Sequence, residues 1–307
     1  MKIKHIFSLA ALAVMTAACS SEDLTQQPAS KIGQTLPFRA TISAYAGTRG
    51  LIEAADGKSI TAKWEVTEKI ALVHSRLDDA KKPIVDVMEV KYVESNTGNA
   101  CIEGTINNYV EGETVYLVYT GHNEMSMNDY PGVMENALAN SQPEPTAITQ
   151  EMIIGSFSIP REGTLADIND CSDYRLGIST LTKMTGTEYV TFGSDAPTLS
   201  SQFAMWKLTL TTDGTTALEA SQLYITCGGK TYTIDPTGDT TLSTFYVLLP
   251  ASTNATYKFK ATDGTNTYIV TYSGVTLAAA KYYCSTLTLK PATGTNDYNI
   301  VTTVQEW

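Results

Sequence analysis

The sequence predicts an all-β protein, with two tandem β-sandwich domains that follow a signal peptide and a short tether. Charged residues make up only 17% of the 307 residues, while Thr, Tyr and Val, which suit a pleated and half-buried surface, are plentiful. Short segments of alternating hydrophobicity recur with turn residues between them, which is typical of sandwiches and barrels. The spacing of the segments does not match a parallel α/β fold. We expect domains over residues 36–200 and 201–307.

The chain opens with the pattern of a lipoprotein signal peptide over residues 1–18. Lys2 and Lys4 are positively charged, residues 6–14 are apolar, and two alanines precede Cys19. The apolar run is much shorter than the roughly 20 residues that a membrane-spanning helix needs. Cleavage before Cys19 would leave this cysteine to carry acyl chains such as palmitate, which would anchor the protein to a membrane. The alternative is an ordinary secreted protein in which this cysteine is incidental.

Residues 19–35 are polar and are interpreted as a lipidated, flexible tether. Within them, Ser20-Ser21-Glu22-Asp23 resembles the acidic export tag on surface-exposed lipoproteins of Bacteroidia-type Gram-negative bacteria. The sequence therefore predicts a surface lipoprotein of the cell outer membrane.

Charge and cysteine spacing narrow the possible partners. The formal net charge is -11, which repels phosphate groups, so no nucleic acid partner is expected. Cys101, Cys171, Cys227 and Cys284 lack CxxC spacing, so no zinc site is predicted. Export permits disulfides among these cysteines, but the sequence does not choose between the pairings, and free thiols fit it equally well.

The first strand after the tether is predicted over residues 36–44. Phe38, Ala40, Ile42 and Ala44 share one face of this segment, and polar residues alternate with them on the other face. This alternation indicates a half-buried strand.

Further strands are expected along both domains. In the first domain they cover residues 59–64, 69–74, 85–93, 100–106, 114–120 and 153–159. The stretch from 121 to 150 is interpreted as a long excursion with one helical turn near 133–139. In the second domain the strands cover residues 203–211, 222–227, 230–234, 243–249, 256–261, 267–272 and 282–289. Between them, the pairs Asp213-Gly214, Gly228-Gly229 and Asp263-Gly264 predict tight turns.

The sequence carries no recognisable catalytic motif. HExxH, GxSxG, GxGxxG and the P-loop pattern are all missing. His74 is expected at the surface where a strand ends, and His122 is expected in a solvated loop rather than at a metal. Trp64 and Trp206 lie in alternating segments and are expected to fill the core. We therefore expect no enzymatic activity, no cofactor and no metal.

The order of features at both ends of the chain carries a family resemblance. Phe38-Arg39-Ala40 and Thr48-Arg49 are followed by Lys63-Trp64 and an apolar strand at 69–73, which resembles the N-terminal pattern of the fimbrillin family. The acidic Gly-Asp that the family has after the Trp is replaced here by Val66-Thr67-Glu68. The C-terminal features that are similar to the fimbrillin C-terminal domain are residues 246–250, 257–259, 277–283 and 287–289, together with Trp307.

This resemblance implies a type V pilin or a pilin-like surface lipoprotein with two transthyretin-like, Greek-key sandwich domains. In stalk pilins of the family, an Arg-specific surface protease cuts after an Arg that follows the first strand, and an extended segment of another subunit fills the groove. Here Arg49 best matches the cleaved residue, and a plain loop arginine is the alternative. Arg39 lies inside the first strand and is expected to be protected.

Elementary energetics make this mechanism physically reasonable. Loss of the first strand would expose unpaired backbone groups and empty apolar pockets, and a donor strand would satisfy both. If the strand buries roughly 200 Å² of apolar surface, the vacancy is worth about 5 kcal/mol. The expected donor is the C-terminal tail, in which Tyr298, Ile300 and Val304 share one face. The alternative is a tail that pairs within its own domain.

Together these observations predict a fimbrial subunit or assembly component that supports adhesion. Its expected partners are other pilin subunits, an Arg-specific protease and, through Cys19, outer-membrane lipid. The alternative is a monomeric surface lipoprotein that binds glycan or host protein through an exposed aromatic patch involving Trp307 or Tyr130.

Overall fold

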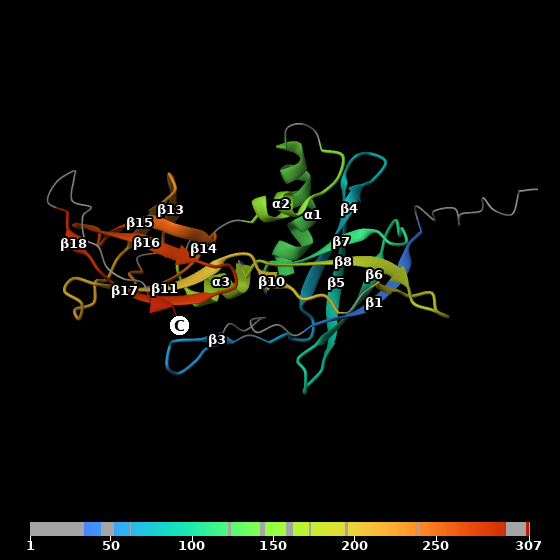
Figure 1. The fold of residues 1–307 in the computed structure, drawn as a ribbon, viewed down its shortest axis with the longest axis horizontal. Helices are drawn as coiled ribbons and strands as arrows, with labels where there is room; N and C mark the ends of the chain where they lie inside the picture. The colour runs from blue at the N-terminus through green and yellow to red at the C-terminus, as the bar shows by residue number, and fades with distance from the viewer. Residues whose placement is uncertain are drawn as a thin grey trace, which may run out of the picture.

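The structure is a computed structural model of the chain. It describes residues 34–43, 52–61, 63–121, 124–141, 145–157, 162–171, 173–193, 196–238, 240–292 and 305–306. Strands make up most of its regular structure, and they form several sheets in a sandwich-like arrangement (Figure 1). The predicted all-β class is therefore confirmed.

The N-terminal half is one sheet of eight strands that curls back on itself. In sheet order these are β10 (Ser200–Ser201), β8 (Arg175–Lys183), β7 (Thr114–Tyr119), β4 (Lys69–Leu77), β5 (Pro83–Val93), β6 (Ala100–Ile106), β1 (Leu36–Ile42) and β9 (Val190–Phe192). Strand β9 pairs with both β1 and β8, so the sheet closes into a ring. The inside of the ring is filled by apolar side chains, among them Phe38, Trp64 and Leu117.

Helices cover the outer face of this sheet where β5, β4, β7 and β8 lie side by side. They are α1 (Glu124–Ala139) and α2 (Gln150–Gly155), and they pack with outward-facing sheet residues such as Val73 and Val118. Both faces of β4 are therefore buried, which explains its unbroken apolar run. A third helix, α3 (Leu165–Cys171), lies near the C-terminal half (Figure 1).

Two predictions about the middle of the chain are wrong. The expected excursion with one helical turn is helix α1, which starts at Glu124. A strand was expected over residues 153–159, but residues 153–155 belong to helix α2. Thr149 caps the start of this helix, because its side chain accepts a hydrogen bond from the Met152 amide. Strands β8 and β9 were not among the predicted strands.

The C-terminal half is a sandwich of two sheets. One sheet has the order β14 (Thr244–Leu249), β11 (Ala204–Thr211), β17 (Tyr282–Thr288) and β19 (Gln305–Glu306). The other has the order β13 (Lys230–Ile234), β12 (Gln222–Cys227), β15 (Ser252–Thr262), β16 (Thr267–Leu277) and β18 (Lys290–Pro291). Between the sheets, Trp206 meets the rings of Tyr257 and Phe259 edge-on, at centroid distances of 5.5 and 5.7 Å. Trp64 and Trp206 are thus both core residues, as expected.

The three predicted tight turns are present in the C-terminal half. Gly228 and Gly229 both have positive φ and join β12 to β13, and Asp263-Gly264 joins β15 to β16. At the third site, the Asp213 carboxylate accepts hydrogen bonds from the amides of Thr215 and Thr216, which forms a tight loop after β11. Not every pairing is antiparallel, because β11 and β17 run parallel to each other.

The two halves have separate cores and meet at a small apolar contact. One core draws on residues 36–199 and the other on residues 204–289. Between them, Tyr174, Phe203 and Leu248 form a cluster that joins the halves. A short hairpin of β2 (Ile52–Glu53) and β3 (Ile60–Thr61) also bridges them. In the part of the chain with described positions, no helix combines the length and the apolar character needed to cross a membrane.

Candidate functional site

The candidate site is β1 together with the groove that holds it. The inward side chains of β1, which are Leu36, Phe38, Ala40 and Ile42, are all less than 8% exposed, and the residues between them face outward. All seven residues of β1 pair antiparallel with β6, from Leu36 opposite Ile106 to Ile42 opposite Ala100. On its other side β1 meets β9 in parallel, at Phe38 and Val190. The predicted half-buried strand is therefore present from Leu36 to Ile42, while Ala44 lies outside the described residues.

Both ends of β1 are held by hydrogen bonds outside the strand pairing. At the start, the Tyr109 amide donates to the Gln34 carbonyl over 3.3 Å. At the end, the Ser43 amide and hydroxyl donate to the carbonyls of Pro197 and Ala196, over 3.1 and 2.9 Å. The segment from residue 34 to 43 is thus a bounded unit whose place in the sheet is fixed at each end.

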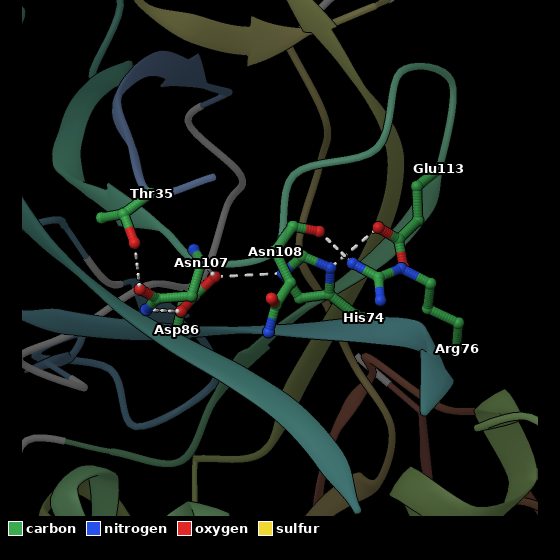
Figure 2. A network of polar contacts seen from close by, with 7 residues as sticks. All are labelled: Thr35, His74, Arg76, Asp86, Asn107, Asn108 and Glu113. Atoms are coloured by element: carbon green, nitrogen blue, oxygen red, sulfur yellow. Dashed lines mark hydrogen bonds and ion pairs between the residues drawn. The ribbon is translucent and has the colours of Figure 1, made fainter. Parts of the chain in front are cut away.

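A buried ion network lies near the start of β1 (Figure 2). His74 of β4 is fully buried; its Nε2 lies 3.0 Å from Asp86 Oδ2, and its Nδ1 lies 2.9 Å from Glu113 Oε2. The Arg76 guanidinium forms an ion pair with Glu113 at 3.0 Å and donates to the Asn108 carbonyl. The network therefore joins β4 and β5 to the segment just before β7.

Asn107 connects this network to β1. Its amide and side-chain NH₂ donate to the Asp86 carboxylate over 3.0 and 2.6 Å, and its side-chain oxygen accepts a hydrogen bond from the Thr35 hydroxyl over 3.1 Å (Figure 2). A continuous polar chain thus runs from Thr35, beside the first inward residue of β1, to the His74 ring.

The two carboxylates determine the charge of His74. Burial by itself lowers the pKa of His74, but the hydrogen bonds and charges of Asp86 and Glu113 outweigh burial and raise this pKa above its ordinary value. The imidazolium therefore bridges two acidic side chains. Such a buried ion network fixes geometry strongly, because removal of one member leaves uncompensated charge.

The sequence-based expectation for His74 is wrong, and a signal for the network was available. Asp86 shares the inner face of β5 with Ile84, Met88 and Val90. This face therefore carries a carboxylate among apolar residues. A buried carboxylate requires a partner. His74 is the last residue of the unbroken buried run of β4, and the half-buried end of the strand follows it.

Several predicted site residues lie outside the described residues. These are Cys19, Arg49, His122 and the tail residues Tyr298, Ile300, Val304 and Trp307. Next to the tail positions, Gln305–Glu306 pair as β19 with Tyr283 and Cys284 of the same chain. Arg39, expected to be protected, pairs with Glu103 in the middle of β1.

Two further expectations concern aromatic and thiol side chains. Tyr130, predicted as part of an exposed aromatic patch, is instead only 3% exposed and packs in the cluster beneath α1, so this expectation is wrong. Cys101, Cys227 and Cys284 are free thiols. Among the residues with described positions, no group of three or more His, Cys, Asp or Glu side chains could hold a metal ion.

Comparisons with known proteins find similarity only among solved structures. No protein-family model matches the sequence, and no curated protein matches it. The chain is similar to a fimbrial assembly protein from Parabacteroides distasonis, with 10% identity and a TM-score of 0.36 over 83% of this chain and 91% of that one.

It is also similar to two structures described as "putative cell adhesion protein". The one from Bacteroides ovatus has 11% identity and a TM-score of 0.38, over 90% of this chain and 98% of that one. The one from Bacteroides fragilis has 12% identity and a TM-score of 0.33, over 87% of this chain and 100% of that one. The descriptions of these three structures name fimbrial assembly or cell adhesion.

Proposed function

We propose that this protein is a fimbrial subunit or assembly component that supports adhesion and polymerises by strand exchange. The observation that carries the proposal is the position of β1. It is the first described strand of the chain, it buries four side chains on one face, and Arg49 follows it after only seven residues. One cut at this point would separate an entire strand from the remainder of the sheet.

The consequence of such a cut follows from the pairing of β1. Its departure would leave the β1-facing edge of β6 unpaired from Ala100 to Ile106, while the other edge of β6 stays paired with β5, and would empty four apolar pockets. Unpaired strand edges accept extended segments of other chains through main-chain hydrogen bonds, while alternate side chains fill the pockets. A cleaved subunit is thereby driven to bind a neighbour.

The proposed location is the outer surface of the cell. Export through the signal peptide and acylation of Cys19 would hold the uncut chain at the outer membrane. Cys19, which would carry the lipid, and β1 both precede Arg49 in the sequence. One cut after Arg49 would therefore release the subunit from the membrane and open the groove at the same time. An Arg-specific protease and other pilin subunits are the proposed partners.

The test is digestion of the folded lipoprotein with an Arg-specific protease. We expect loss of the chain up to Arg49, followed by oligomers in size-exclusion chromatography. Arg49→Gln should stay uncut and monomeric, whereas the matched control Arg39→Gln should be cut and should assemble as the unaltered chain does. Equal cutting of Arg49→Gln, or a cut chain that stays monomeric, would contradict the proposal.

A further inference from the structure

We propose that a cleft between the two halves of the molecule binds a short acidic oligosaccharide, and that Lys230 recognises the carboxylate of this ligand. The cleft has a volume of about 510 Å³ and lies between α2 on one side and β13 on the other (Figure 1). Sites for small molecules have volumes of this size and are common between domains. The cleft belongs to the uncut chain, so this inference goes beyond strand exchange and does not depend on it.

One wall of the cleft is apolar and rigid. Phe157 and Phe203 line it, together with Ile154 of α2. The ring of Phe157 stacks on that of Tyr174 with the centroids 4.4 Å apart, and the Phe203 carbonyl accepts a hydrogen bond from the Ala280 amide over 3.0 Å. Rings that are already held in place offer flat apolar surface to a ligand with little further loss of side-chain freedom.

The opposite wall is one edge of strand β13. Four consecutive residues of this strand, 230–233, line the cleft. Successive side chains of a strand point to opposite faces, so a cleft that meets four residues in a row lies along the edge of the strand. Among the strands that the structure describes, β12 is the only partner of β13. The edge that faces away from β12 can therefore offer backbone N–H and C=O groups to a ligand.

Polar side chains stand beside these backbone groups. Thr231 and Thr233 are exposed on β13, and the side-chain nitrogen of Gln202 donates to the Ser200 carbonyl over 2.8 Å, which holds this amide at the cleft. The cleft thus combines flat rings with hydrogen-bond donors and acceptors. Sugars have the same division, with apolar C–H faces and hydroxyl groups around the ring. A fatty acid would instead cover these polar groups without hydrogen bonds, which costs free energy.

Lys230 gives the cleft its charge. Among the described residues that line the cleft, it is the only charged one. It is exposed at the start of β13 and forms no ion pair with any residue that the structure describes, although the chain has 32 acidic residues against 21 Lys and Arg. An ammonium group beside donors and acceptors favours a ligand that carries a carboxylate.

An extended peptide is the other ligand that the edge of a strand can accept. The lined part of β13 is about 13 Å long, and the whole strand has only five residues. A peptide would therefore gain few main-chain hydrogen bonds from this edge. A compact ligand of a few sugar rings can instead use the edge, the hydroxyl groups and the aromatic wall together.

The test is an array of oligosaccharides of two to four sugars, in which each carboxylate-bearing member is printed beside its neutral counterpart. The folded, uncut chain is applied together with the variants Lys230→Gln, Thr233→Val and Lys281→Gln. We expect the unaltered chain to bind acidic members at least about tenfold more tightly than their neutral counterparts. Lys230→Gln should lose this preference, and Thr233→Val should weaken binding to both forms.

Lys281→Gln is the matched control, because it removes the same charge from an exposed residue of the same half that does not line the cleft. It should bind as the unaltered chain does. Absence of binding to every acidic member, or an equal loss in Lys230→Gln and Lys281→Gln, would overturn the proposal. Binding of a polyglutamate peptide in place of any oligosaccharide would assign the β13 edge to strand addition and would also overturn it. These results leave cutting at Arg49 and strand exchange untouched, so the two proposals fail separately.

Discussion

At the scale of single residues, the principal feature is a buried histidine between two carboxylates. His74, Asp86 and Glu113 come from three separate segments, and each is less than 9% exposed. Their contacts are short, and Arg76 also pairs with Glu113, so two positive and two negative groups compensate one another. Asn107 extends this arrangement to Thr35, which means that the fixed charges also position the chain where β1 begins.

Replacement of His74 by Gln should destabilise the protein and remove a pH dependence. The pKa of His74 is raised in the folded state, so the folded chain binds more protons than the unfolded chain above about pH 6.5. The stabilisation is fully present below that pH and is lost as the pH rises through the folded pKa. We expect His74→Gln to reduce the free energy of unfolding by about 3–5 kcal/mol near pH 6 and to flatten its decline toward pH 9, as measured by urea denaturation.

A matched control is the exposed ion pair of Lys91 and Glu89, in which Lys91 Nζ lies 2.6 Å from Glu89 Oε1. Lys91→Gln should change the free energy of unfolding by less than about 1 kcal/mol and leave its pH dependence intact, because exposed ion pairs contribute little. The same pH slope in His74→Gln as in the unaltered protein would show that His74 is not the titrating group.

At the scale of elements, the hairpin of β2 and β3 is held by one carboxylate. Glu53 accepts hydrogen bonds from Lys207 Nζ at 2.6 Å and from the hydroxyls of Tyr246 and Tyr282 at 2.7 Å each. These donors come from β11, β14 and β17, so a short hairpin spans three strands of the C-terminal sandwich. Burial raises the pKa of Glu53, but the three hydrogen bonds outweigh burial and lower this pKa below its usual value.

Replacement of Glu53 by Gln should loosen this hairpin. The loss of charge weakens the hydrogen bonds to all three donors, since charge-assisted bonds are about twice as strong as neutral ones. We expect amide hydrogen exchange at Ala54 and Gly57, which form the hairpin's own bonds, to become at least about tenfold faster. Glu188→Gln, at an exposed ion pair, serves as the control, and unchanged exchange in Glu53→Gln would contradict the role given to this carboxylate.

Elements with local signals could be predicted from the sequence, and elements fixed by distant partners could not. Strands β6, β12 and β13 have the bounds that their alternation indicates, and the glycines of the β12–β13 turn mark their own positions. Strand β9 is only three residues long and exists because it bridges β1 and β8, which lie far apart in the sequence. Helix α2 depends on a single cap at Thr149, and an apolar run of its length is equally compatible with a strand.

The candidate site shows the same division. The alternating face of Phe38, Ala40 and Ile42 is a local pattern, and the structure confirms it. The network beneath it joins residues 35 to 113, and no short segment contains two of its contacting members in a recognisable spacing. Pairing of β4 with β5 and β7, and of β1 with β6, brings them together.

At the scale of the whole molecule, the two halves are joined by an aromatic cluster. The rings of Phe157 and Tyr174 stack with their centroids 4.4 Å apart. The ring centroid of Phe203 lies 6.3 Å from that of Phe157 and 5.9 Å from that of Tyr174. Phe203 lies directly between β10 of the N-terminal sheet and β11 of the C-terminal sandwich. Each half has its own core, so this cluster couples two units that are otherwise self-contained.

Phe203→Ala should uncouple the two halves. The change removes a buried ring at the junction. We expect it to reduce the free energy of unfolding by about 3–5 kcal/mol, chiefly by weakening the contact between the two halves. We expect scanning calorimetry to show two thermal transitions that lie further apart than in the unaltered chain, whereas Phe203→Leu should resemble the unaltered chain. A single transition that shifts downward as a whole would contradict this uncoupling.

Under the proposed strand exchange, the closure of the N-terminal sheet would also give an assembly a direction. Strand β1 runs antiparallel to β6 on one side and parallel to β9 on the other, so the slot between these walls distinguishes the two senses of an entering chain. In that exchange, a subunit that receives through such a slot and gives a different segment of its own has two unlike binding surfaces. Such heterologous contacts would build a fibre that grows one way, provided that the rotation between subunits does not close a ring.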